Sequence, residues 1–416
     1  MTLNCGLDFG TSNSTLGVAA NGVPHLLPLE DGKQTIPSAI FFSFEEDATY
    51  FGRKALSEYV TGGDGRIMRA LKSVLGTSLI NDKTRIKKNL VPFTDILGLF
   101  IAELKQRAEA ALDGELDQVV VGRPVRFVDE DDVADAQAQA QLEAAVRQQG
   151  YRHVEFQFEP IAAALDYERT VEREELALVI DLGGGTSDFT VIRVSPERAR
   201  STDRAGDILA TAGVHIGGTD FDRLLSLGKV MPMLGYQTET ADHKRVLPSA
   251  PYYDLATWHR INRLYNAKTL SELRSTRNEA EHPDLVERMI DIVDNRLGHR
   301  LGATVEEAKI ALSDAEAVDF AFEGHEHTIA TRISRDDFNA VLENSVGRLK
   351  ATIQATLSQA GVGSEAIETL ILTGGSTLVP AIVSALGEMF PAARTVRTDV
   401  LGSVGLGLAL DASRRF

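Results

Sequence analysis

A glycine-rich turn between two apolar stretches limits the fold of this chain more than any other feature. The apolar run 178–180 leads into Asp181, three glycines follow at 183–185, and an apolar alternation with a period of two resumes at Phe189. This pattern predicts a strand on each side of the turn. Glycine has no Cβ, so backbone N–H groups can approach an anion, and Asp181 can offer an oxygen to a hydrated Mg²⁺. We interpret the stretch as a phosphate clamp, and a strand after the glycines argues against a Walker loop and a Rossmann turn, both of which open helices.

The same pattern occurs near the N-terminus. An apolar stretch reaches Asp8, and Gly10, two hydroxyl residues and a further apolar alternation follow. One Asp–Gly turn of this kind is more often a plain β-hairpin. Two copies, one in each half of the chain, favour a nucleotide held between two related lobes.

A third glycine pair follows the apolar stretch 369–373. Gly374 and Gly375 lead to Ser376 and Thr377, either of which is a candidate N-cap for a helix. The alternative interpretation is an ordinary strand-to-helix turn.

Charge and composition exclude several partners. The net charge of −17 disfavours broad binding to nucleic-acid phosphates, but not to a nucleotide, whose contacts are local. The single cysteine, Cys5, cannot form an internal disulfide, which predicts a reducing, cytoplasmic location. The sequence has no apolar run long enough for a bilayer and no basic-then-apolar leader, so we expect no membrane association and no signal peptide.

Together these motifs resemble the nucleotide-binding domain of DnaK-type heat-shock chaperones, in the actin-like ATPase superfamily. Two further segments, 158–167 and 214–222, resemble signatures of that family, and the likeness extends through nearly the whole chain. In length the chain is similar to the bacterial YegD-like proteins, which consist of the ATPase half alone. The resemblance implies an α/β, two-lobed actin-like ATPase fold, made of duplicated ribonuclease-H-like domains with inserted subdomains. It also implies ATP or ADP with Mg²⁺ as ligands.

The resemblance also predicts a domain organisation. We expect lobe I at 1–175 with an inserted subdomain at about 36–92, and lobe II at 176–416 with an insert at about 226–333. A C-terminal helix, 400–412, should return to lobe I, and we expect no peptide-binding domain. The helical part of the second insert, 226–301, is either a protein-partner surface, a thicker lid over the nucleotide or a solvated helical decoration.

Site residues follow from the resemblance, position by position. The implied catalytic residues are Lys72, Glu159, Asp181 and Thr186, and the implied metal-holding residues are Asp8 and Asp181. The implied nucleotide-binding residues are Gly10, Thr11, Ser12, Asn13, Gly183, Gly184, Gly185, Thr186, Gly217, Gly218, Glu306, Lys309, Ile310, Ser313, Gly374, Gly375, Ser376 and Leu378. Spacing alone would favour a solvated surface for Lys72 and a helix-capping role for Glu159.

Three positions depart from the family pattern. Ile310 and Leu378 stand where two arginines normally enclose the adenine, and this loss of cation–π contact costs about 0.5–2 kcal/mol for each arginine. An apolar slot can still hold a flat base, so we expect weaker nucleotide binding. In the predicted helix 130–149, Gln139 stands where the family has an interdomain-switch arginine.

Three function classes therefore compete. The first is a slow, Mg-dependent ATPase of chaperone type that lacks a substrate-binding domain. The second is a nucleotide-gated regulator or scaffold that hydrolyses little ATP, which the missing arginines favour. The third is a small-metabolite kinase of the same superfamily. A kinase needs a base near the γ-phosphate for an acceptor, and the sequence offers no acid there beyond the metal set.

Overall fold

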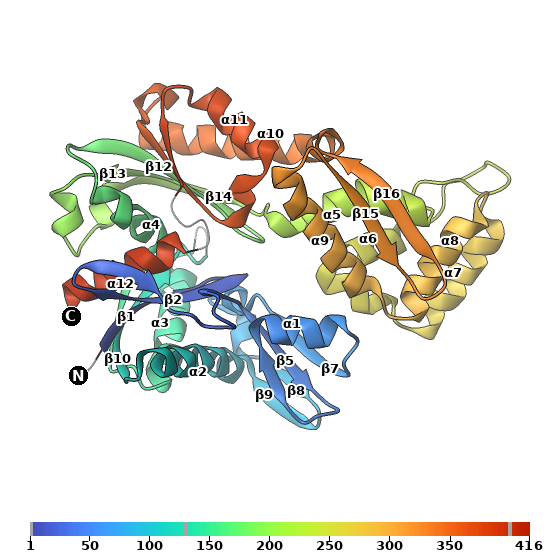
Figure 1. Cartoon of the computed structure of the whole chain (residues 1–416), viewed down its shortest axis with the longest axis horizontal. Helices are drawn as coiled ribbons and strands as arrows, with labels where there is room; N and C mark the ends of the chain where they lie inside the picture. Colours follow the sequence, from blue (N-terminus) through green and yellow to red (C-terminus); the bar gives the residue numbers. More distant parts are fainter. Residues whose placement is uncertain (1–2, 129–130, 398–401) are drawn as a thin grey trace.

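The computed structural model describes residues 3–128, 131–397 and 402–416. The chain forms two halves, each with a central sheet and a smaller insert, and both ends of the chain lie on the same side (Figure 1). We call the half that contains β1 lobe I and the half that contains β12 lobe II. The boundaries expected at 175 and 176 remain predictions.

Lobe I begins with a strand hairpin and continues through the insert. It ends with helices that alternate with the last strands of its central sheet. Its strands are β1 (Leu3–Phe9), β2 (Asn13–Ala20), β3 (Val23–Leu26), β4 (Thr35–Pro37), β5 (Ala39–Ser43), β6 (Thr49–Phe51), β7 (Gly65–Arg69), β8 (Lys83–Ile86), β9 (Asn89–Pro92), β10 (Leu116–Arg123) and β11 (His153–Phe158). Its helices are α1 (Gly52–Val60), α2 (Phe93–Leu112), α3 (Asp132–Gln148) and α4 (Glu159–Glu168).

Lobe II repeats this order with a larger insert. Its strands are β12 (Glu175–Leu182), β13 (Ser187–Val194), β14 (Ile208–Val214), β15 (Ala317–Glu323), β16 (Thr328–Ser334), β17 (Thr369–Thr373) and β18 (Arg394–Arg397). Its helices are α5 (Gly218–Leu225), α6 (Ala250–Ala256), α7 (Ala267–Glu279), α8 (Pro283–Asp294), α9 (Gly298–Asp314), α10 (Arg335–Ala360), α11 (Pro380–Met389) and α12 (Ser403–Arg415).

The two central sheets have the same topology. In lobe I the strand order is β3-β2-β1-β10-β11, and in lobe II it is β14-β13-β12-β17-β18. In each, the first three strands pair antiparallel and the last two add in parallel. This repetition confirms the predicted α/β fold with two related lobes. It also brings the β1–β2 and β12–β13 turns, which carry the glycine motifs, to equivalent positions.

Both inserts project from the same side of the molecule (Figure 1). In lobe I, β6, β5 and β7 form a three-stranded sheet, and β8 pairs with β9. In lobe II, α6 to α9 and the β15–β16 hairpin form the insert. Helix α1 contacts α9, so the two inserts touch each other.

Helix α12 packs against β1, β2 and β10 of lobe I and against α4. Glycines on both sides permit this close approach: a Cβ on Gly407 of α12 would lie 1.8 Å from the carbonyl oxygen of Ala162, and one on Gly6 of β1 would lie 2.2 Å from the backbone nitrogen of Ala409. A buried cluster of α4, α12 and β12 side chains therefore joins the two lobes. The predicted helix 400–412 begins at Ser403 and continues to Arg415, and positions 400 and 401 lie outside the described residues.

Two other helix boundaries differ from the expected ones. The helix expected over 130–149 is α3, which begins at Asp132, and position 130 lies outside the described residues. The expected N-cap at Ser376 or Thr377 is wrong, because Gly375–Leu378 is a 3₁₀ turn and α11 begins at Pro380. Thr377 donates its hydroxyl to the carbonyl of Gly374 instead, and proline suits a first helical position. Within the described residues, no helix is both long and apolar enough to cross a bilayer.

Candidate functional site

Two aspartates stand at the ends of equivalent strands. Asp8 lies on β1 opposite Thr15, and Asp181 lies on β12 opposite Asp188. Both side chains are partly buried, and the charge of Asp8 acts on Asp181. The duplicated topology thus brings together the two acids that the sequence predicted as metal-holding residues.

The environment disfavours negative charge on both acids. Burial raises the pKa of Asp8 to about 7, and the charge of Glu159 adds to this rise. Burial raises the pKa of Asp181 to about 8, and the charges of Asp188, Glu159 and Asp8 add to it. Two carboxylates that repel each other away from water are a donor set that fits a divalent cation, since the cation would offset both charges.

Lys72 forms an ion pair with Glu159 beside these acids. Lys72 lies on a short 3₁₀ helix, Leu71–Val74, and Glu159 is the first residue of α4. Burial opposes the charge on Lys72, but Glu159, Asp8 and Asp181 together raise its pKa. The ammonium is therefore held charged at a nearly enclosed position. The solvated surface favoured by spacing alone is wrong for Lys72, whose side chain is only 10% exposed.

The glycine turns pack directly on one another. A Cβ on Gly184 would lie 2.1 Å from the Ser12 hydroxyl oxygen, so the turns of the two lobes are in contact. The Gly218 amide donates to the Gly183 carbonyl at 3.0 Å. The Thr219 amide donates to the Gly184 carbonyl at 2.8 Å. A side chain at Gly184 would therefore force the Ser12 hydroxyl of the other lobe to move.

The remaining members of these turns lie around the same point. The Gly183 amide donates to the Thr186 carbonyl at 2.9 Å, which closes the turn and leaves Gly185 and Thr186 exposed. In lobe I, a Cβ on Gly10 would meet the carbonyl oxygen of Asn13 at 2.2 Å. A hydrogen bond from the Ser38 amide to the carbonyl of Ser12 also holds the 10–13 turn.

The third glycine pair joins this group. Gly374 has a φ of 83°, a conformation that favours glycine, and a Cβ there would lie 2.3 Å from the Leu182 carbonyl oxygen. Ser376 lies next to Gly375, and its hydroxyl donates to the Gly183 carbonyl at 3.4 Å. The structure therefore brings the three sequence motifs together, although they are spread over more than 360 residues of the chain.

Helix α9 forms the adjacent wall. The Lys309 ammonium lies 2.8 Å from an Asp222 carboxylate oxygen and donates to the Gly218 carbonyl at 3.4 Å. Burial raises the pKa of Asp222 to about 6, and Lys309 opposes this rise. Glu306 is exposed on the same helix, and Ser313 lies near its end. Asp222 was not among the predicted site residues, although it belongs to the 214–222 signature.

The two apolar residues predicted to replace the adenine arginines are exposed. Ile310 on α9 is 59% exposed, and Leu378 in the 3₁₀ turn before α11 is 41% exposed. Large apolar side chains at the surface cost solvation free energy unless a ligand covers them. Their exposure is compatible with the predicted apolar slot for a base.

Gln139 lines a different cavity, of about 360 Å³, between the lobes at the side of α12. Arg123, at the end of β10, donates hydrogen bonds to the Gln139 amide oxygen and to the Asp135 carboxylate. Arg415 of α12 lines the same cavity. The Arg123 guanidinium thus lies beside Gln139, the position at which the family has its switch arginine. Arg123 belongs to strand β10, whereas Gln139 belongs to helix α3.

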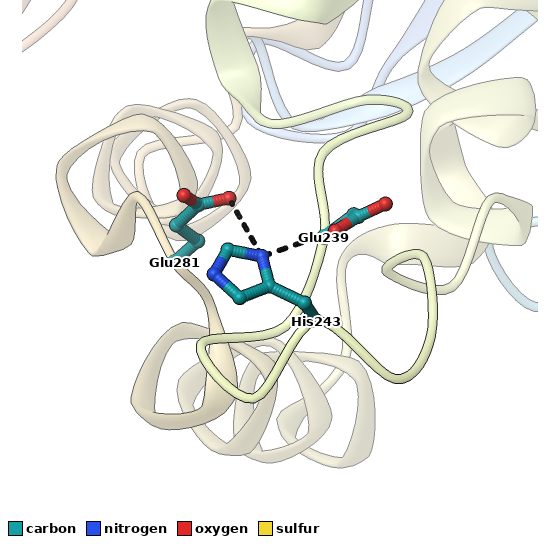
Figure 2. Close-up of side chains that lie close together, drawn as sticks. All are labelled: Glu239, His243 and Glu281. Carbon is teal, nitrogen blue, oxygen red and sulfur yellow. Dashed lines mark hydrogen bonds and ion pairs between the residues drawn. The ribbon is translucent and has the colours of Figure 1, made fainter.

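The described residues also contain one surface group with metal-ligand chemistry, formed by Glu239, His243 and Glu281 (Figure 2). His243 Nδ1 lies 3.1 Å from Glu239 Oε2 and 3.8 Å from Glu281 Oε2. All three side chains are exposed on the insert of lobe II. When His243 is protonated, they form ion pairs that tie the loop before α6 to the start of α8.

Comparison with known proteins identifies relatives that match most of this chain. The family model described as "Hsp70 protein" matches residues 4–228 and 285–413. The chaperone protein HscA homolog of Cupriavidus metallidurans is 27% identical over 430 residues, which is 99% of this chain and 58% of the relative. The chaperone protein HscA of Citrobacter koseri is 27% identical over 431 residues, 98% of this chain and 58% of the relative. The chain therefore spans less than two thirds of these relatives.

Proposed function

Because this chain belongs to the Hsp70 protein family, we propose that it binds ATP and ADP between its two lobes and hydrolyses ATP slowly, as a chaperone-type ATPase. The family match and the chaperone names of its relatives support this proposal. The observation that carries it is the nearly enclosed Lys72–Glu159 ion pair, on whose ammonium both Asp8 and Asp181 act electrostatically.

Asp8 and Asp181 are proposed to hold a hydrated Mg²⁺ from opposite lobes. When bound, Mg²⁺ would neutralise phosphate charge and orient the phosphate chain. The raised pKa values of both acids support this role, because a cation would make their ionised forms favourable. Asp181 also acts on Lys72, so loss of its charge would change the field at the reacting phosphate.

Lys72 is proposed to stabilise the charge that develops on the transferred phosphoryl group. A charged ammonium that is held in place before reaction stabilises such charge strongly in a site with little water. Glu159 is proposed to hold this ammonium and to accept a hydrogen bond from the attacking water. Thr186, exposed at the edge of the clamp, is proposed to offer its hydroxyl to the same region.

Backbone N–H groups of the two glycine turns are proposed to bind the phosphates. In lobe I these belong to Gly10, Thr11 and Ser12, and in lobe II to 184–186, while the Gly183 amide closes the turn through the Thr186 carbonyl. Asn13, Gly217, Gly218, Gly374, Gly375 and Ser376 are proposed to shape the same site. Because the turns of the two lobes touch, a phosphate between them would link the nucleotide state to the lobe angle.

The adenosine is proposed to lie along α9, between Ile310 and Leu378, with Glu306, Lys309 and Ser313 along one helix face. Burial of the two exposed side chains by a base favours binding through apolar area. Without arginine stacking, nucleotide affinity is proposed to be weaker than with two arginines. This feature also favours a second candidate, a nucleotide-gated regulator that hydrolyses little ATP.

The helical insert is proposed as the surface for a protein partner. The family match omits residues 229–284, which correspond to most of the helical region 226–301. Partner recognition by a segment outside the common family core would explain its size.

Calorimetry with ATP and ADP in the presence of Mg²⁺, together with phosphate release, tests these proposals. We expect both nucleotides to bind to the wild type and slow turnover that is lost in Asp181→Asn. Binding without turnover in the wild type would favour the regulator. If neither nucleotide binds, the proposed function is wrong and the slot between Ile310 and Leu378 serves another ligand.

A further inference from the structure

Arg69 of lobe I reaches across to lobe II. It is the last residue of β7 in the first insert, and its guanidinium carbon lies 4.8 Å from the centre of the Trp258 ring. Trp258 begins the 3₁₀ helix Trp258–Leu264 in the insert of lobe II. A cation over an indole face is the most favourable pairing of this type.

The Trp258 ring packs against helix α9 of its own lobe. The Trp258 and His299 rings pack edge to face with their centres 4.9 Å apart, and an added Cβ on Gly302 would lie 3.4 Å from the indole. His299 is buried, and burial lowers its pKa to about 4, so it is neutral at physiological pH. The partner of Arg69 is therefore an aromatic ring that itself packs on helix α9.

A second contact between the inserts lies beside the first. Tyr59 of α1 packs against the His299 ring with centres 4.5 Å apart, and its hydroxyl lies 3.2 Å from His299 Nε2. Asn262 donates to the same hydroxyl at 2.6 Å. Two residues of lobe I, Tyr59 and Arg69, thus contact one group of lobe II side chains.

Charge also draws Arg69 towards lobe II. Burial lowers the pKa of Arg69, and the negative charges of Glu306 and Asp222 oppose this change. Both acids belong to lobe II, and Asp222 also pairs with Lys309 in the proposed nucleotide site. Parting of the two lobes would leave Arg69 without its ring and without these charges.

Only two residues separate Arg69 from Lys72. Ala70 has φ 55° and ψ 40°, a left-handed conformation that a residue with a Cβ adopts only when its surroundings hold it. Leu71 is buried in the core of lobe I, and Lys72 then points to Glu159. The segment 69–72 is therefore held at one end by lobe II and at the other by the proposed catalytic group.

We propose that Arg69 is a positioning residue, whose contact with Trp258 couples closure of the two lobes to placement of the Lys72 ammonium beside Glu159. The inference rests on the proposed ATPase function. In this arrangement Lys72 is correctly placed only while the inserts are in contact. Any partner or ligand that parts the inserts also withdraws the group that promotes hydrolysis.

A double-mutant cycle tests this coupling. The variants are Arg69→Ala, Trp258→Leu and the double variant, with Arg66→Ala as control because it removes an exposed arginine from the same strand. We expect each single variant to lower kcat by about two- to thirtyfold, the factor that corresponds to one cation–π contact, with KM changed less than about twofold. The double variant should fall no further, and Trp258→Phe, which keeps an aromatic face, should recover most of the rate.

Hydrogen–deuterium exchange of residues 70–75 without nucleotide provides a second readout, which does not depend on turnover. We expect faster exchange in Trp258→Leu than in the wild type, although the substituted residue lies in the other lobe. If the wild type shows no turnover, the proposed function fails and this exchange measurement alone decides the coupling. Unchanged exchange, independent effects on kcat in the double variant, or a change in KM alone would each overturn the inference.

Discussion

Gly217 of lobe II lies against the backbone of Gly184, so closely that an added Cβ would be 2.5 Å from the Gly184 carbonyl carbon. We predict that Gly217→Ala displaces the phosphate clamp, lowers the free energy of unfolding by about 1–3 kcal/mol, and weakens ATP binding at least about tenfold. Calorimetry and thermal unfolding measure both effects. Gly206→Ala is the matched control, since an added Cβ there meets no atom within 4 Å. Equal affinities for the two variants would contradict this account of the turn.

Lys72→Ala should reduce ATP turnover by about 10²- to 10³-fold, because it removes a charged donor that is already in place for the developing phosphate charge. Glu159 would lose its ion-pair partner in the same variant. Phosphate release under single-turnover conditions measures the change. Lys54→Ala removes an equal charge from an exposed pair on α1 and should leave the rate unaltered. Unchanged hydrolysis in Lys72→Ala would exclude Lys72 from the reaction.

The raised pKa of Asp181 predicts a pH dependence of stability without metal or nucleotide. An acid with a higher pKa in the folded state binds more protons when folded, so its ionisation destabilises the protein as pH rises from about 4 to about 8. Asp181→Asn should therefore be more stable than the wild type at pH 8, on the order of 1–3 kcal/mol, and about equal near pH 4. Thermal unfolding across this range measures the difference.

Asp64→Asn, at an exposed position of the first insert, provides the control for loss of one negative charge. Addition of Mg²⁺ should raise the melting temperature of the wild type more at pH 8 than at pH 6, since ionised carboxylates bind the ion. A stability difference between wild type and Asp181→Asn that does not vary with pH would show that burial does not govern this acid.

Arginine at the two apolar positions should strengthen nucleotide binding. Ile310→Arg and Leu378→Arg each place a guanidinium where the side chain is now exposed, and each should increase ADP affinity by about two- to thirtyfold, as one cation–π contact allows. Calorimetry with ADP measures the gain. Leu99→Arg, at a partly exposed position of α2, controls for added positive charge. If all three variants bind ADP equally, the base does not lie between Ile310 and Leu378.

The buried Glu168–Arg204 pair should contribute strongly to stability. Both side chains are almost fully enclosed, and Arg204 also pairs with Asp207. Glu168→Ala would leave a buried guanidinium with one carboxylate instead of two, and we expect a loss of about 3–5 kcal/mol in the free energy of unfolding. Chemical denaturation measures it, and Glu174→Ala, which removes an exposed partner of Arg198, should cost less than about 1 kcal/mol.

Local sequence patterns predicted those elements of the fold that are determined by residues close together in the sequence. The period-two alternation around Asp181 predicts the two strands that form there, because strand pairing imposes that period. The start of α11 could not be read in this way. Both Ser376 and Thr377 are good N-cap residues, and only the tertiary contact with Gly183 shows where the Ser376 hydroxyl goes.

The sequence predicted only those residues of the candidate site that belong to recognisable motifs. The ion pair of Lys72 with Glu159 joins residues 87 positions apart, and family resemblance rather than spacing selected both. Arg69, Trp258 and His299 had no local signal, because an arginine at a strand end and a histidine in a helix are ordinary surface residues until another lobe covers them. Contacts between distant segments are the information that a single sequence does not display.

The position of α12 has a consequence for biosynthesis. Strands β1, β2 and β10 leave the ribosome early, yet the helix that covers their apolar face is Ser403–Arg415, made hundreds of residues later. This face of the first lobe therefore stays uncovered while the second lobe is translated. At about 5–20 residues per second, that translation takes tens of seconds. A nascent chain of this fold is exposed to aggregation during that interval, and it would itself be a client for the holding factors that bind apolar surfaces at the ribosome exit.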